Sequence, residues 1–148
     1  MNPTRQLCTF RLHDLSFGVA VEQVQEVLRC QPMTRVPLAP AVVRGLINLR
    51  GQIVTAFDLH RRLGLAERRA DSAPMNVVVR TEDGPVSFLV DEIGDVVEVS
   101  ADQFEKPPNT LRGPARLLIQ GAYKLPGQLL LVLDPNVVVR VEGDASAW

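Results

Sequence analysis

Hydrophobic residues in this chain gather in short runs that Gly, Pro and Asp separate. Residues 76–81 and 86–90 are two such runs, and the turn sequence Glu-Asp-Gly-Pro lies between them at 82–85. Asp and Gly accept the positive φ of a tight turn, and Pro can stand where a strand begins. The pattern predicts a β-hairpin here, and the spacing of the runs is typical of an all-β sandwich or barrel.

The same pattern recurs around three other polar turns. Three further hairpins are therefore predicted, with strands at 7–12 and 17–21, at 47–49 and 53–57, and at 122–125 and 129–133. Their turns contain His13-Asp14, Arg50-Gly51 and Pro126-Gly127.

Between the predicted hairpins at 7–21 and 47–57 the spacing of hydrophobic residues changes. Val21, Val24, Val27 and Leu28 recur at helical spacing, and Glu and Gln occupy the intervening positions. Such a pattern predicts a short amphipathic helix of a turn or two.

The chain also contains an internal repeat at about half its length. The segment 51–58 returns as 127–134, and Ser16-Phe17 returns as Ser87-Phe88. Two similar small β units explain the repeat. Because each is short for a large core, we expect them to share one, with the polar segment 67–74 as their connection. Residues 1–148 then form a single domain made of two subdomains.

The composition and charge of the chain disfavour several classes of function. The chain has 148 residues, 46% of them hydrophobic and 22% charged, which fits one soluble globular domain. A formal net charge of -1 and 5% aromatic residues disfavour nucleic acid as a partner. No apolar stretch approaches the roughly 20 residues of a membrane span. Cys8 and Cys30 form no disulfide pattern, which favours the cytoplasm, and the basic residues Arg61, Arg62, Arg68 and Arg69 are expected to be solvated.

Candidate chemistry is sparse. His13 and His60 have no metal-motif spacing, so we expect both to be surface or capping residues, with no metal and no cofactor. The glycines between 45 and 51 lack the pattern of a phosphate loop. Free Cys is more often a small buried hydrophobe than a nucleophile. The acidic residues Asp91, Glu92, Asp95 and Glu98 favour a solvated strand end, although spatial pairing of two carboxylates stays open.

One segment is specific. Residues 43–54, followed by Phe57-Asp58-Leu59, closely resemble the central signature of the CheW family of chemotaxis coupling proteins. Segments 17–27, 88–96 and 129–134 resemble that family in the same order. Together they cover nearly the whole chain, as expected for a stand-alone adaptor. The chain departs from the family at Thr55, where Pro is frequent, and at His60, where Arg is common, and both changes leave partner affinity open.

The resemblance implies two five-stranded SH3-like barrels that share a hydrophobic core, with short helices. It also implies a non-enzymatic adaptor between a CheA-type histidine kinase and the cytoplasmic tips of methyl-accepting chemoreceptors. The protein would be cytoplasmic and recruited to membrane-associated receptor arrays without inserting into the membrane. Alternatives are an adaptor of a related chemosensory system, controlling twitching motility or another output, and, from a different class, a small β-barrel enzyme or nucleic-acid module.

The resemblance also suggests which residues bind. For a receptor-binding groove we choose Val21, Val24, Val27 and Val90, each of which could instead be a plain core residue. For the interface with kinase and receptor we choose Glu26, Gly45, Asn48, Arg50 and Gly51. Arg50 precedes a glycine in a tight turn, and the repeat has Pro126 in its place, so the barrel does not require Arg. The alternative is a structural Arg that fastens the turn to a carboxylate such as Asp58.

Overall fold

All four predicted hairpins are present in the computed structural model, which describes residues 3–67 and 73–140. Each joins two hydrophobic runs across a short turn that contains a residue with positive φ, such as Arg50, Gly84 or Gly127. The strands are β1 (Thr4–Leu12), β2 (Leu15–Ala20), β3 (Val24–Leu28), β4 (Val43–Leu49), β5 (Gln52–Asp58), β6 (Met75–Thr81), β7 (Gly84–Val90), β8 (Glu92–Ser100), β9 (Phe104–Glu105), β10 (Ile119–Leu125) and β11 (Gln128–Leu133). The helices are α1 (Leu59–Arg62), α2 (Pro114–Leu118) and α3 (Pro135–Val138), with single 3-10 turns η1 (Val21–Gln23) and η2 (Ala101–Gln103).

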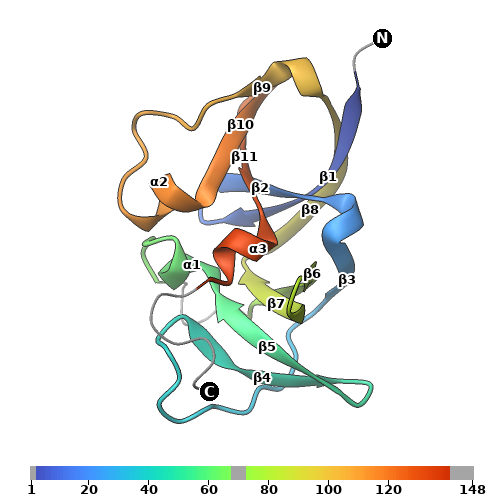
Figure 1. Ribbon diagram of the computed structural model, residues 1–148, viewed down its shortest axis with the longest axis vertical. Coiled ribbons are helices and arrows are strands. Elements are labelled where there is room, and N and C mark those ends of the chain that lie inside the picture. Colours follow the sequence, from blue (N-terminus) through green and yellow to red (C-terminus); the bar gives the residue numbers. More distant parts are fainter. Residues whose placement is uncertain (1–2, 68–72, 141–148) are drawn as a thin grey trace.

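The strands form two barrels, one above the other, with α1 and α3 at their junction (Figure 1). The five-stranded barrel has the order β3-β6-β7-β5-β4, and the six-stranded barrel has the order β8-β1-β2-β11-β10-β9. Each contains one parallel pair, β5 with β7 and β2 with β11. The predicted all-β fold is confirmed, and the extra strand is β9, which is only two residues long.

The internal repeat is present, but its halves are not the barrels. The hairpin β1–β2 from the first half pairs with β8 and β11 from the second half, while β6–β7 pairs with β3 and β5 from the first. Each barrel therefore takes strands from both halves. The segment 67–74 lies between the two halves of the repeat, as predicted, but because the halves exchange strands it comes between β5 and β6 of the same barrel rather than between the two barrels. Residues 68–72, with Arg68 and Arg69, lie outside the described part.

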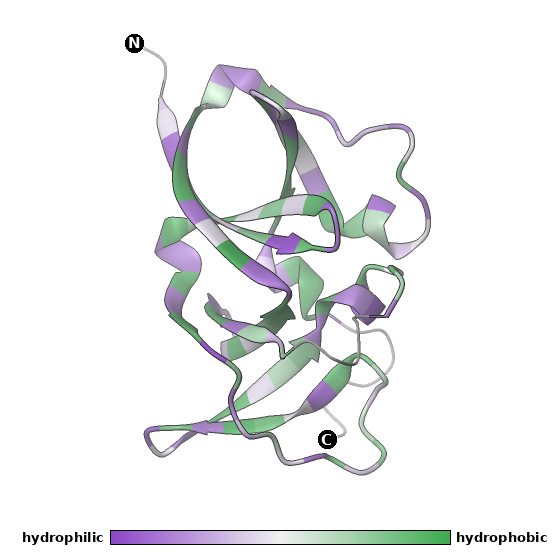
Figure 2. Ribbon diagram, turned by 180° about the vertical axis from the view of Figure 1, so that it is seen from behind, coloured by the Kyte–Doolittle hydropathy of each residue, from purple (hydrophilic) through white to green (hydrophobic). Residues whose placement is uncertain are grey.

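A shared hydrophobic core joins the barrels, as predicted. Hydrophobic and hydrophilic residues alternate along many strands (Figure 2), so that strands such as β4 bury one face, whereas β6, β7 and β11 carry runs of consecutive buried residues. Each fully buried Phe or Leu side chain contributes roughly 1.5–3 kcal/mol. The shared core includes Phe10, Leu12, Phe17, Leu131 and Leu133 from the six-stranded barrel and Phe57, Val77, Val79, Phe88 and Val90 from the five-stranded barrel. A smaller cluster fills each barrel, around Leu7 and Tyr123 in one and around Ile47 and Val78 in the other.

The predicted helix over 21–28 is wrong. The segment makes one 3-10 turn and then becomes β3, which pairs with β6. The register shifts between Val24 and Glu26, so that Val24 lies opposite Val79 and Val27 lies opposite Val77. Residues directly opposite each other on paired strands lie on the same face of the sheet. In a regular strand, residues on one face are two positions apart, but the extra residue of a β-bulge makes this spacing three positions locally. The bulge thus places Val24 and Val27 on one face at a spacing that imitates a helix.

None of the helices in the described ranges is long and apolar enough to cross a membrane.

Candidate functional site

The turn between β4 and β5 is an exposed part of the signature segment. Arg50 and Gly51 form the two-residue connection with φ of 52° and 88°, the signs of a type I′ turn. The side-chain oxygen of Asn48 accepts a hydrogen bond from the backbone N–H of Gly51 at 2.9 Å. An Arg in left-handed backbone conformation costs about 1–2 kcal/mol. The turn therefore holds a charged side chain outward where glycine would be less strained.

Arg50 pairs with Glu26. Its Nη2 donates to Oε2 of Glu26 on β3, and the Arg50 side chain is 71% exposed. The alternative partner, Asp58, instead caps α1 by accepting from the backbone N–H of Arg61 and faces Arg44 at 3.8 Å. The structure thus brings together two residues predicted for the same interface, one from β3 and one from the β4–β5 turn.

Gly45 allows the segment around Thr34 to pack closely against β4. It is buried, and a Cβ at this position would lie 2.7 Å from the carbonyl oxygen of Thr34. The Thr34 segment crosses here and exchanges two 2.8 Å backbone hydrogen bonds with Leu46. Glycine is therefore needed for close approach of two backbones. Its effect on a partner would be indirect, through the position of β4.

The four groove valines do not share one surface. Val27 is 40% exposed, whereas Val24 and Val21 are half-buried. Val24 packs against the shared core, and the register places Val27 on the same face, at the rim of the junction between the barrels. Val90 is 0% exposed and belongs to the core, so it cannot line a groove, and its assignment is corrected.

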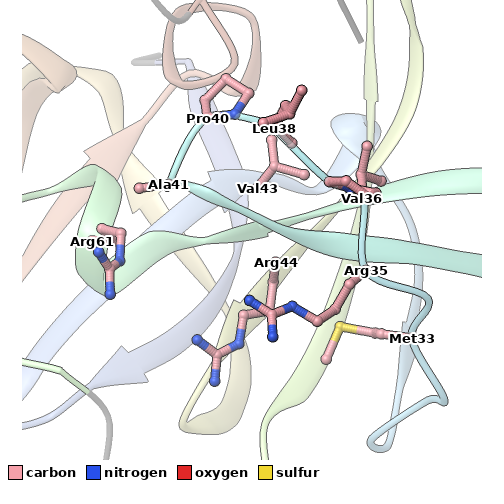
Figure 3. Close-up of a pocket in the computed structure, with 11 residues that line it drawn as sticks. Met33, Arg35, Val36, Leu38, Pro40, Ala41, Val43, Arg44 and Arg61 are labelled. Atoms are coloured by element: carbon pink, nitrogen blue, oxygen red, sulfur yellow. The ribbon is translucent and has the colours of Figure 1, made fainter.

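A basic pocket of about 830 Å³ lies beside β4 (Figure 3). Its lining includes Arg35, Arg44 and Arg61, with apolar residues of the segment 36–41. Two of the three charges have partners, because Arg44 faces Asp58 at 3.8 Å and Arg61 bonds Glu67 at 2.8 Å. The predicted solvated basic run holds for Arg61, which is exposed.

Arg62, by contrast, is half-buried and donates to the carbonyl oxygens of Val138 at 2.7 Å and Arg140 at 2.6 Å. It therefore ties α1 to the end of α3, and the prediction of a solvated residue is wrong at this position.

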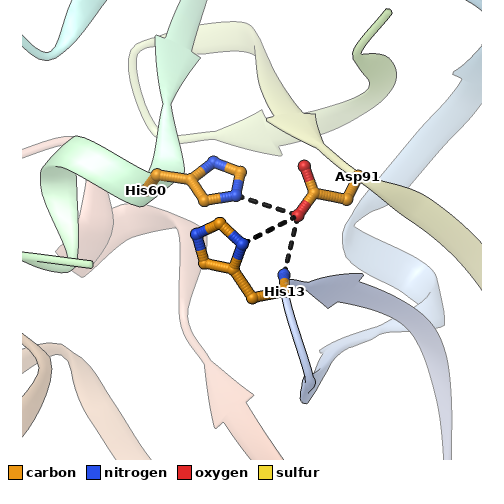
Figure 4. A group of neighbouring side chains, drawn as sticks. All are labelled: His13, His60 and Asp91. Atoms are coloured by element: carbon orange, nitrogen blue, oxygen red, sulfur yellow. Dashed lines mark hydrogen bonds and ion pairs between the residues drawn. The ribbon is translucent and has the colours of Figure 1, made fainter. Parts of the chain in front are cut away.

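A cluster that sequence spacing did not predict lies at the barrel junction (Figure 4). His13 in the β1–β2 turn, His60 on α1 and Asp91 between β7 and β8 place ligand atoms within 4.8 Å of one another. His60 is 2% exposed, so its predicted surface role is wrong. His13 stays exposed, as predicted. The sequence signal for partial burial of Asp91 was its position directly after the largely apolar strand 86–90. The neighbouring acidic residues Glu92, Asp95 and Glu98 are exposed, as predicted for a strand end.

Burial and hydrogen bonding have opposite effects on the pKa of Asp91. Burial alone would raise the pKa of its carboxyl group, but the backbone N–H of His13 and the hydrogen bond and charge of His60 together lower that pKa below its usual value. Oδ2 accepts from the backbone N–H of His13 at 2.7 Å and from Nε2 of His60 at 3.0 Å. The carboxylate is therefore charged at neutral pH.

The two cysteines lie apart from this cluster. Partial burial raises the pKa of the Cys8 thiol, which lies in β1 as predicted, and Cys30 is exposed. A raised pKa lowers the thiolate fraction and with it the nucleophilicity.

These features define a paired β-barrel module with an exposed edge strand and a charged turn. The chain belongs to the CheW-like domain family, whose model matches residues 6–142. It is 32% identical over 133 residues to the chemotaxis protein CheW of Treponema pallidum (strain Nichols), covering 87% of this chain and 78% of that one. It is 29% identical over 142 residues to chemotaxis protein CheW of Bacillus subtilis (strain 168), covering 96% and 91%.

A solved structure supports the fold. The crystal structure of the scaffolding protein TtCheW from Thermoanaerobacter tengcongensis aligns with a TM-score of 0.85 and 23% identity, over 97% of each chain. The predicted family resemblance is thus confirmed.

Proposed function

We propose that this protein is a non-enzymatic adaptor that couples a CheA-type histidine kinase to the cytoplasmic tips of methyl-accepting chemoreceptors. The observation that carries the proposal is the CheW-like domain match over residues 6–142. The two relatives described above carry the name chemotaxis protein CheW, and this chain covers most of each. The adaptor would work in the cytoplasm and be recruited to membrane-associated arrays by its partners.

Two surfaces support binding at different places. The first is the valine rim, formed by Val21, Val24 and Val27 at the barrel junction. Apolar side chains at such a rim suit the apolar face of an amphipathic helix, and a receptor tip is a helical hairpin in the family. β3 is also the outer strand of its sheet, which leaves one side for contacts with another β domain.

The second surface is the charged turn, formed by Asn48, Arg50 and Gly51 together with Glu26. Arg presents a planar fork of donors that matches carboxylates on a partner, and central Arg residues often dominate binding energy. We assign the charged turn to the interface with kinase and receptor. Gly45 supports it from inside the barrel.

Val27→Asp tests the valine rim, and Val96→Asp is its matched control. Val96 is 54% exposed on β8, the outer strand of the other barrel at the position that corresponds to β3. We expect Val27→Asp to weaken retention of a chemoreceptor cytoplasmic fragment by roughly tenfold or more, because it places a charge against an apolar helix face. Val96→Asp should bind like the parent protein.

Urea denaturation of both variants completes the test. A partly exposed site should lose only about 1 kcal/mol of unfolding free energy. If Val27→Asp loses several kcal/mol, Val27 is a core residue and the rim assignment is wrong. If the parent protein retains neither a CheA-type kinase nor a chemoreceptor fragment, the adaptor proposal itself fails.

A further inference from the structure

His13, His60 and Asp91 come from three separate elements and meet at the junction of the two barrels (Figure 4). His13 belongs to the six-stranded barrel, His60 follows β5 of the five-stranded barrel, and Asp91 lies where the chain crosses from β7 to β8. We propose that these side chains bind one divalent transition-metal ion, with Zn²⁺ as the probe, that links the two barrels.

The distances suit a metal with nitrogen and oxygen ligands. Nε2 of His60 lies 3.0 Å from Oδ2 of Asp91, and Nδ1 of His13 lies 4.0 Å from the same oxygen. Ligand atoms at about 2.0–2.2 Å from a tetrahedral ion are separated by roughly 3.3–3.6 Å. The observed separations lie on either side of that value, so small side-chain rotations bring the three ligands to a common ion.

The hydrogen bond between His13 Nε2 and Ala66 orients the other ring nitrogen, Nδ1, toward the carboxylate of Asp91. Nε2 of His13 lies 2.8 Å from the carbonyl oxygen of Ala66, which can only accept, so Nε2 carries the hydrogen. In the uncharged form of the ring, Nδ1 then presents a lone pair to Asp91, so that two acceptors face each other. A cation between them removes this conflict, and the contact with Ala66 becomes the outer hydrogen bond that orients a metal-binding His.

His60 has the matching outer partner. Its Nδ1 faces Oδ1 of Asp58 at 3.8 Å, while Nε2 faces Asp91. When Nε2 binds the ion it gives up its hydrogen, and Nδ1–H then points toward a carboxylate, as in many zinc sites. Both imidazoles thus have acceptors on the side away from the proposed ion.

Asp91 supplies independent support. Its Oδ1 is buried and has no hydrogen-bond partner among the described residues, although Oδ2 has several contacts. An unsatisfied buried carboxylate oxygen is costly, and each such atom calls for an explanation. A bound cation shared by the two oxygens provides one.

The matching position in the second half of the repeat shows which contact is needed to attach such a helix to its neighbouring hairpin. Asn136 on α3 corresponds to His60 in the repeat, and its side-chain oxygen accepts from the backbone N–H of Glu82 in the β6–β7 turn at 2.8 Å. One amide is enough to attach that helix to its hairpin. The junction at α1 instead carries two imidazoles and a carboxylate, which exceeds this structural need.

The test uses full-length protein without a histidine tag. After removal of metals with a chelator, it is equilibrated with Zn²⁺, separated from free ion, and analysed for zinc per chain. We expect one zinc per chain and a rise in melting temperature when zinc is added, because the ion binds the folded state. His13→Asn removes a ligand while tolerating positive φ, and Asp91→Asn removes the charge with little change in shape. Each should lower zinc affinity by roughly tenfold or more.

Cys30→Ser is the matched control, since it removes an exposed ligand-type side chain outside the cluster. It should leave zinc affinity unchanged. Co²⁺ substitution should give visible d–d bands without the ultraviolet thiolate band. No stoichiometric zinc, or zinc that survives both cluster variants or disappears with Cys30→Ser, would overturn the proposal. Far-ultraviolet circular dichroism of the metal-free variants separates lost binding from lost folding.

Discussion

Arg50 offers the sharpest separation of binding from folding, because the structure limits what it contributes to stability. Its ion pair with Glu26 involves a side chain that is 71% exposed, and pairs of this kind contribute about 0.2–1 kcal/mol. Its left-handed backbone, with φ of 52°, costs about 1–2 kcal/mol, which Gly would avoid at the expense of greater unfolded-state entropy. These terms oppose each other, so Arg50→Gly should change the unfolding free energy by about 1 kcal/mol or less.

The assay compares thermal unfolding with kinase activation in a reconstituted complex of receptor, kinase and adaptor. For a protein of this size, 1 kcal/mol corresponds to a shift of about 2–4 °C in melting temperature. We expect Arg50→Gly, Arg50→Ala and Arg50→Glu to melt within that range. Activation should fall roughly tenfold or more, because each variant removes the guanidinium that would contact a partner.

The charge exchange Glu26→Arg with Arg50→Glu decides between two roles. It preserves an ion pair within the protein but reverses the charge shown to a partner. If the exchange restores activation lost in Arg50→Glu, the pair matters only internally and the interface assignment is refuted. The same conclusion follows if Arg50→Ala unfolds many degrees below the parent and activity tracks its folded fraction.

Two further predictions concern a buried glycine and the two cysteines. Gly45→Ala places a Cβ 2.7 Å from the carbonyl oxygen of Thr34, so the unfolding free energy in urea should fall by roughly 1–3 kcal/mol, and an unchanged value would show that the crossing segment yields freely. Burial raises the pKa of the Cys8 thiol, so limited alkylation by iodoacetamide near neutral pH should modify exposed Cys30 first; peptide mass spectrometry showing equal rates would contradict the sheltered setting of Cys8.

The sequence predicted local structure better than spatial assembly. Hairpins such as that around Arg50 and Gly51 depend on neighbouring residues, and all four predicted ones form. The false helix at Val24 and Val27 arose because a β-bulge imitates helical spacing, and the bulge depends on pairing with a distant strand. Val90 illustrates a related limit, since apolar periodicity does not distinguish a core face from an interface.

For the candidate sites, too, the sequence identified individual residues but not the contacts between them. Glu26 and Arg50 were each predicted from a family resemblance, yet their contact is a property of the fold. His13 and His60 are 47 positions apart, and their meeting requires the β1–β2 turn to reach the helix that follows β5. No spacing rule within one segment could find that arrangement. The internal repeat offered the nearest signal, because His60 replaces the Asn136 of the matching helix.

The exchange of strands between the barrels has a consequence for how the chain acquires its structure during synthesis. The β1–β2 hairpin emerges early, but its neighbours β8 and β11 end only at Ser100 and Leu133. Until then the two edges of that hairpin lack their native neighbouring strands, and a proteolytic cut between the halves separates strands that belong to the same barrel. Pairing over such long separations slows folding and prolongs exposure of unpaired edges. The strands of the five-stranded barrel are complete once Val90 has been made, whereas the six-stranded barrel must wait for almost the entire chain before it can close.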